Sequence, residues 1–271
     1  MSTGVEVSFD SLDGLQLQGT MLMPDEILGS PTVLVHGGGV NRDEGGFFTR
    51  LAIALKSSGM PCLRFDFRGH GESQGDQESL TLLGVSNDIR TAVDYLISVT
   101  GKEKVNIIGA SFSGGICAFY AAHFPDSVQR LVLFNPLMDY KKRFIDDKPY
   151  WNNGYIDAEK AEELRRQGAI EHSPTFKLGR PLLNEVFYVK PKNELPSIQA
   201  PTLIVHGTKD TFIPIQSSRE VLDNFGGGAR LIEIDGAQHG FAVHDDPKYL
   251  NPQTQAWQSR VIRDVVEWLK D

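Results

Sequence analysis

Ser111 stands between residues 105–109, which are typical of a buried strand, and residues 112–123, which are typical of a helix. A serine at such a junction projects from a tight turn, close to the free N–H groups of the helix, and can act as a nucleophile. The surrounding pattern is G-x-S-x-G except at its last position, which holds the small residue Ser113. Two alternatives are that Ser111 only caps the helix, and that Ser113, inside the expected helix, is the reactive hydroxyl.

A serine hydroxyl is a poor nucleophile unless a base takes its proton and an acid orients that base. His239 lies in a glycine-containing loop between the last expected strand and the last expected helix, and His244 is the second candidate base. Asp210 follows an expected strand, at the edge of the sheet where Ser111 should lie, and Asp139 is the competing acid. We predict that Ser111, Asp210 and His239 form a catalytic triad.

Three glycines, residues 37–39, follow an expected strand at 32–35. Glycines allow the backbone to turn N–H groups toward a developing oxyanion. By position, the N–H groups of Gly38 and Phe112 are the expected donors. A glycine-rich loop can also cradle a phosphate, but neither G-x-x-x-x-G-K-[ST] nor G-x-G-x-x-G occurs, so a nucleotide-binding loop is not predicted.

The elements that must position these residues follow a βαβα rhythm. Alternating residues near the N-terminus predict a hairpin around Asp13 and Gly14. Short apolar runs that fit strands of a parallel sheet begin at residues 32, 62, 105, 131, 202 and 230. Helical periodicity is found at 48–57, 82–99, 112–123, 216–225 and 255–269. This alternation predicts a doubly wound α/β sheet, in which chemistry gathers at the carboxyl ends of the strands.

Residues 137–197 interrupt the rhythm and are interpreted as an inserted cap between the sixth and seventh strands. The segment contains a charged helix at 157–167 and eight aromatic residues. Residues 1–136 and 198–271 would then form the catalytic domain. Because the insert is rich in aromatic side chains, it favours a substrate with an apolar or aromatic acyl group.

Composition excludes several other classes. The chain has 271 residues and a net charge of −8, which disfavours nucleic acid and anionic membranes as partners. The two cysteines, Cys62 and Cys117, are too few for a disulfide framework or a four-thiolate zinc site. No metal site and no cofactor is expected. Neither a leader nor a membrane-spanning run is apparent, so a soluble cytoplasmic protein is expected, either a monomer or a homo-oligomer.

Taken together, the motifs resemble those of serine α/β-hydrolases, in the branch of the cinnamoyl/feruloyl esterases and serine aminopeptidase-like enzymes. The matching pieces are His36-Gly-Gly-Gly, Phe65-Asp-Phe-Arg-Gly-His-Gly-Glu-Ser, Gly109-Ala-Ser-Phe-Ser-Gly, His206-Gly-Thr-Lys-Asp and Gln238-His-Gly-Phe.

The resemblance implies the α/β-hydrolase fold, with a mostly parallel eight-stranded sheet flanked by helices. It implies Ser111 as nucleophile, Asp210 as acid and His239 as base, in the chain order of that fold. It also implies the N–H groups of Gly38 and Phe112 as oxyanion donors. Ser113 departs from the elbow pattern, and Gly38 stands where these esterases often carry a bulkier residue. His70 is interpreted as supporting the site and His206 as structural.

The function expected from these residues is hydrolysis of a carboxylic ester through an acyl-enzyme. The same machinery could release an acyl chain from a carrier protein or coenzyme A, or cleave an amide or peptide, and the sequence does not separate these substrates. A hypothesis from another class is a non-catalytic binder of small molecules. It predicts a missing or misplaced triad member, whereas all three residues are present in order.

Overall fold

One sheet of eight strands forms the centre of the computed structural model, which describes residues 4–270. Residues 1–3, part of the segment searched for a leader, and residue 271 lie outside the described residues. The strands are β1 Val5–Asp10, β2 Gln16–Leu22, β3 Thr32–Val35, β4 Cys62–Phe65, β5 Val105–Ala110, β6 Val128–Phe134, β11 Thr202–Gly207 and β12 Ala229–Ile234.

Their spatial order is β1-β2-β4-β3-β5-β6-β11-β12. The β1–β2 hairpin is antiparallel and joins β4 in antiparallel fashion, while the other pairs are parallel. The predicted hairpin and the predicted parallel strands are thereby confirmed.

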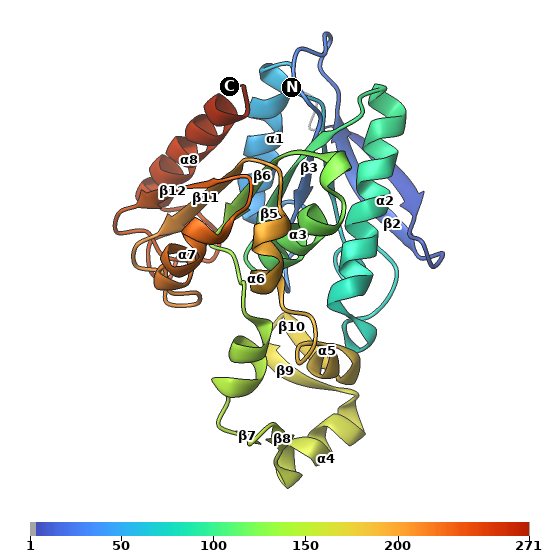
Figure 1. Ribbon diagram of the computed structural model, residues 1–271, viewed down its shortest axis with the longest axis vertical. Helices are drawn as coiled ribbons and strands as arrows, with labels where there is room; N and C mark the ends of the chain where they lie inside the picture. The colour runs from blue at the N-terminus through green and yellow to red at the C-terminus, as the bar shows by residue number, and fades with distance from the viewer. Residues whose placement is uncertain (1–3, 271) are drawn as a thin grey trace.

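Helices cover both faces of the sheet (Figure 1). They are α1 Phe47–Ser57, α2 Leu82–Thr100, α3 Phe112–His123, α7 Gln216–Val221 and α8 Pro252–Lys270. α1 packs beside α8 on one face, and α2 beside α3 on the other. Side chains of a strand point to alternate faces, so Val33 and Val35 join the core under α2 and α3, whereas Leu34 joins the core under α1. The helix predicted at 216–225 ends at Val221 and continues as a short 3₁₀ turn.

Short single turns complete the described elements. They are η1 Glu44–Gly46, η2 Gln77–Ser79, η3 Pro125–Ser127, the π turn η4 Lys142–Asp146, η5 Leu195–Ser197, η6 Leu222–Asn224 and η7 His239–Phe241. Two of them, η1 and η7, follow strand ends at the edge of the sheet where Ser111 lies.

The chain between β6 and β11 makes an excursion away from the sheet, toward the bottom of Figure 1. Its elements are β7 Trp151–Asn152, β8 Tyr155–Ile156, α4 Ala158–Gln167, β9 Ala169–Ser173, β10 Phe176–Gly179, α5 Arg180–Glu185 and α6 Pro191–Glu194. The charged helix is present as α4, in which only Leu164 is buried. The sequence did not predict the two antiparallel pairs, β7–β8 and β9–β10. The returning helix α6 packs against α3, so this end of the insert lies on the main body.

No helix within residues 4–270 is long and apolar enough to cross a membrane. Within the same residues, no group of three or more His, Cys, Asp or Glu side chains could hold a metal ion. Cys62 and Cys117 are both buried free thiols.

Candidate active site

Ser111 occupies a strained turn between β5 and α3. Its φ and ψ are 53° and −115°, a region that residues with a side chain rarely adopt. The turn is fixed by its backbone: the Ser111 N–H donates to the Phe134 carbonyl at 2.8 Å, and the Ser111 carbonyl accepts the Leu137 N–H at 2.9 Å. Gly109 must lack a side chain, because an added Cβ would lie 2.6 Å from the Cys117 sulfur. The Ser111 side chain makes no capping hydrogen bond to the helix that follows.

Ser113, the departure from the elbow pattern, has a structural role in the first turn of α3. Its side chain is fully buried, and its Oγ lies 2.8 Å from the Val35 carbonyl at the end of β3. The same oxygen accepts the Ala110 N–H at 3.1 Å. Serine therefore fits where a glycine is usual, and its hydroxyl ties α3 to the neighbouring strand instead of facing the site.

His239 joins Ser111 to Asp210. The Nε2 atom of His239 lies 2.9 Å from the Ser111 Oγ, and its Nδ1 atom lies 2.7 Å from Asp210 Oδ2. An ionised carboxylate can only accept, so Nδ1 carries the hydrogen and Nε2 is free to accept the serine proton. The structure thus brings the three predicted triad residues into one hydrogen-bonded row, from the ends of β5 and β11 and from η7.

The surroundings of Asp210 favour the ionised form of its carboxyl group. Burial alone would raise its pKa, but hydrogen bonds from His206 and His239 outweigh that effect and hold the pKa well below its usual range. Its Oδ1 also accepts the N–H groups of Phe212 and Ile213 at 2.8 and 2.9 Å. His206, interpreted as structural, is fully buried, with Nε2 2.8 Å from the Ile213 carbonyl. It therefore braces the loop that holds the acid.

The competing acid and base lie elsewhere. Asp139 forms an ion pair with Lys192, which contributes to lowering its pKa against the opposing effect of burial. His244 is exposed, and its Nε2 lies 3.4 Å from Asp245. Neither residue joins the Ser111 row.

The two expected oxyanion donors come from the loop after β3 and from the first residue of α3, next to Ser111. Within residues 4–270, the N–H groups of Gly38 and Phe112 have no hydrogen-bond acceptor. By contrast, the N–H of Gly37 donates to the Glu44 carboxylate, and the N–H of Gly39 donates to His70 Nε2 at 3.0 Å. Only the middle glycine of the triplet therefore offers an N–H to a ligand, as an oxyanion hole requires.

The aromatic ring of Phe176, from β10 of the insert, covers Gly38. A Cβ added at Gly38 would lie 2.9 Å from the ring. Phe176 is buried and also packs on Phe112, with ring centroids 5.0 Å apart. The ring thus occupies space that a larger side chain at position 38 would need, which gives a physical reason for the second departure from the esterase pattern.

A pocket of about 390 Å³ flanks the triad. Phe212, in the loop after Asp210, contributes to its wall, and its ring centroid is 5.4 Å from that of His239. The other residues of the wall are Leu137, Met138, Asp139, Lys142, Arg143, Asp147, Lys192, Thr211, Ile213, Pro214, Gln216, Ser217, Glu220 and Val221. The pocket thus has a wall of mixed character, with apolar and charged side chains, and lies between the insert and the loop that carries Asp210.

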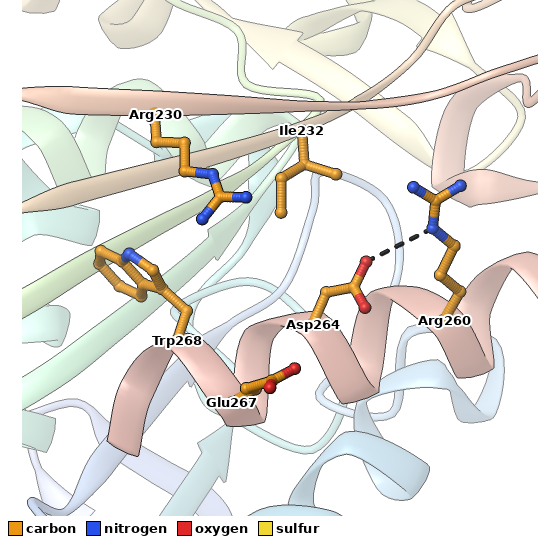
Figure 2. Close-up of a pocket in the computed structure, with 6 residues that line it drawn as sticks. All are labelled: Arg230, Ile232, Arg260, Asp264, Glu267 and Trp268. Carbon is orange, nitrogen blue, oxygen red and sulfur yellow. Dashed lines mark hydrogen bonds and ion pairs between the residues drawn. The ribbon is translucent and has the colours of Figure 1, made fainter. Parts of the chain in front are cut away.

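A second pocket, of about 420 Å³, lies between β12 and α8 and contains none of the site residues. Figure 2 shows its wall, where Arg260 reaches the Asp264 carboxylate across 3.4 Å and Arg230 extends past Trp268. Neither pocket wall includes a triad residue, but the first contains Thr211 and Phe212, next to Asp210, whereas the second contains no residue adjacent in sequence to the triad. The second pocket is therefore not the site of the chemistry expected here.

Comparison with known proteins identifies the class. The model of the alpha/beta hydrolase fold family matches residues 31–190, more than half of the chain. The model of the dienelactone hydrolase family matches residues 179–271. The chain therefore belongs to the α/β-hydrolase superfamily, and the expected fold is confirmed.

Individual relatives are distant but extend over the full chain. A monoacylglycerol lipase of Mycolicibacterium smegmatis is 24% identical over 293 residues, covering 99% of this chain and 98% of that protein. A structure of Est1E from Butyrivibrio proteoclasticus with ferulic acid bound has a TM-score of 0.75 at 20% identity, covering 96% and 99% of the two chains. The monoacylglycerol lipase of Paleococcus ferrophilus has a TM-score of 0.67 at 23% identity, covering 94% and 98%.

Sequence reasoning missed two residues that shape this site. One is Glu44, because a lone glutamate in a glycine-rich loop resembles an ordinary solvated charge. Phe176 was counted only as one aromatic of the insert. The signal for Glu44 was its position in the loop just after the glycine triplet, while nothing local to Phe176 indicates which glycine it covers.

Proposed function

We propose that the protein is a serine hydrolase that cleaves carboxylic esters through an acyl-enzyme. Ser111 is the nucleophile, His239 the general base and acid, and Asp210 the residue that orients His239. The observation that carries this proposal is the hydrogen-bonded row, with 2.9 Å between Ser111 and His239 and 2.7 Å between His239 and Asp210. Three residues from separate segments seldom meet in this geometry without a catalytic reason.

The reaction has two halves. The Ser111 Oγ attacks the acyl carbon while His239 Nε2 takes its proton, and the resulting oxyanion accepts the N–H groups of Gly38 and Phe112. His239 then returns the proton to the alcohol oxygen, and the bond between that oxygen and the acyl carbon breaks. A water molecule, deprotonated by His239, then attacks the acyl carbon. The bond between that carbon and the Ser111 Oγ breaks, the acid leaves, and His239 returns the proton to the Oγ. Ionised Asp210 stabilises the imidazolium in both halves.

The proposed substrate is a small ester with an apolar or aromatic acyl group. Support comes from apolar side chains in the wall of the flanking pocket, such as Phe212 and Leu137, from the Phe176 ring over Gly38, and from relatives named as lipases or bound to ferulic acid. In this proposal residues 137–197 act as a cap that shapes the substrate pocket. Thioesters of a carrier protein or coenzyme A, and amides, are the competing substrate classes.

The test compares wild type with Ser111→Ala on p-nitrophenyl esters of increasing acyl length. Ser98→Ala is the matched control, because Ser98 is an exposed serine on α2. Loss of the nucleophile should reduce kcat by about 10⁴-fold or more, as in other triad enzymes, and Ser98→Ala should have no effect. Equal rates for wild type and Ser111→Ala would refute the proposal. A panel of aryl esters, acyl thioesters and aminoacyl amides then identifies the preferred class.

A further inference from the structure

Glu44 lies in an unusual turn beside the active site. Its φ is 47°, and it is followed by Gly45 and Gly46 with φ of 61° and 88°, so three consecutive residues are left-handed. Glycine adopts this conformation freely, but a glutamate does so only at a cost of about 1–2 kcal/mol. Contacts of the side chain must therefore hold Glu44 in place.

The Glu44 carboxylate packs against the loop that carries Gly38. Its Oε1 accepts the Gly37 N–H. A Cβ added at Gly37 would lie 3.0 Å from that oxygen and 3.3 Å from the Ser111 Cβ. The carboxylate and the nucleophile thus both border the space in which a side chain at position 37 would lie.

The side chain of Tyr249 packs between the Glu44 turn and the loop of His239. The Tyr249 ring lies 2.9 Å from the position of a Cβ at Gly45, and its hydroxyl occupies the space beside Gly240. Tyr249 therefore separates the Glu44 turn from the His239 loop and leaves neither room for a larger side chain. This packing explains how a strained glutamate is retained.

Glu44 has no cationic side chain that would explain its carboxylate as an ordinary ion pair. In the described chain it forms no ion pair, whereas the adjacent Asp43 pairs with Arg64. Burial raises the pKa of Glu44, while the Gly37 N–H and the nearby His239 oppose that shift. A carboxylate that is held beside the nucleophile by a backbone N–H, without a cation, points to a role in the site.

The other end of the glycine triplet is held by a second acceptor. His70 Nε2 accepts the Gly39 N–H, and burial lowers the pKa of His70 to about 4, so the ring is neutral and can accept at neutral pH. With Gly37 and Gly39 both engaged, the peptide between them cannot turn its N–H elsewhere.

We propose that Glu44 is a positioning residue for the oxyanion hole: it fixes the Gly37 N–H so that the Gly38 N–H faces the oxygen of the tetrahedral intermediate. This inference rests on the proposed serine hydrolase function. Glu44 acts through its acceptor oxygen and its reach, and the charge itself is not required.

Two conservative variants distinguish the role of the Glu44 acceptor oxygen from the role of its charge. Glu44→Gln keeps an oxygen that can accept the Gly37 N–H but removes the charge. Glu44→Asp keeps the charge but shortens the side chain by one methylene, so the carboxylate lies farther from the Gly37 N–H. Aspartate tolerates the left-handed turn. With a p-nitrophenyl ester, we expect kcat of Glu44→Gln within about 3-fold of wild type. We expect Glu44→Asp to lose about 10- to 100-fold in kcat with little change in KM, less than the 10²–10³ for a deleted donor.

A transition-state analogue provides a second readout. An aryl trifluoromethyl ketone forms a tetrahedral oxyanion on Ser111, so its inhibition constant for Glu44→Asp should rise by the same factor as kcat/KM falls. Glu26→Ala is the matched control, because Glu26 is an exposed carboxylate in the loop that enters β3 at its amino end. It should leave both constants unchanged.

Several outcomes would overturn the inference. Wild-type rates in Glu44→Asp would show that the reach of the carboxylate does not matter. A defective Glu44→Gln beside an active Glu44→Asp would show that the charge acts on His239 instead. Ser111→Ala is measured in parallel, because a wild type whose turnover does not depend on Ser111 refutes the proposed function itself.

Discussion

Replacing Gly38 by alanine should destabilise the protein because of one ring in the insert. The three atoms nearest to an added Cβ all belong to Phe176, at 2.9, 3.1 and 3.1 Å. The backbone of Gly38 is not in the left-handed region, so alanine meets no conformational strain there. The ring is the nearest obstacle to the methyl group, so removing the ring should remove most of the penalty.

The magnitudes follow from the packing. Overpacking by one methyl group against a buried ring costs about 1–3 kcal/mol, the expected effect of Gly38→Ala. Phe176 is 4% exposed, so Phe176→Ala should cost about 3–5 kcal/mol through lost burial and a cavity. In the double variant the methyl group occupies part of that cavity. We expect the double variant to be about 1–3 kcal/mol more stable than the sum of the two single effects.

Urea unfolding of the four proteins measures this coupling. The control cycle pairs Gly38→Ala with Leu164→Ala, because Leu164 is also buried in the insert but belongs to α4. That control should be additive within about 0.5 kcal/mol. If the Gly38 and Phe176 effects are also additive, the ring does not restrict position 38 and the reasoning is refuted.

Three further predictions concern stability. Ser113→Ala should cost about 1–2 kcal/mol, because it leaves the buried Val35 carbonyl without its hydroxyl donor, yet kcat should change little; denaturation and ester turnover test both. The pKa of His70 is about 4 in the folded protein and about 6.5 in the unfolded chain, so neutral His70 contributes fully to stability above about pH 6.5. This contribution is lost as the pH falls toward 4. Relative to His70→Gln, the free energy of unfolding of the wild type should fall by about 3 kcal/mol over that pH range. Arg68→Ala leaves the fully buried Asp88 carboxylate unpaired and should cost about 3–5 kcal/mol, and adding Asp88→Asn should recover part of that loss in the same assay.

The sequence predicted the sheet and the residues at its carboxyl edge because both depend on local patterns. Short apolar runs separated by helical periods define parallel strands, and the strand ends then place residues such as Ser111 and Asp210 near one another. His239 was harder, since a loop histidine carries no pattern of its own. It was chosen for its position after the last strand, and the structure has its ring between the other two side chains.

The insert could not be predicted in the same way. β9 and β10 are short, and their pairing contains an irregularity between Phe176 and Lys177. Such strands have too few residues to show a clear alternation. The contact of Phe176 with Gly38 depends on how the whole insert folds back, which no local pattern encodes. The same applies to Glu44, whose role depends on a backbone N–H seven residues earlier.

These contacts connect the insert to the chemistry and not only to substrate binding. Residues 37–39 are held by Glu44 on one side and by His70 on the other, while Phe176 covers Gly38. Phe176 also packs on Phe112, whose N–H is the second proposed donor. A ring that contacts both donor residues can displace both N–H groups when it moves. Changes in the insert that shift Phe176 should therefore lower kcat as well as alter KM, whereas changes confined to the outer wall of the pocket should act mainly on KM.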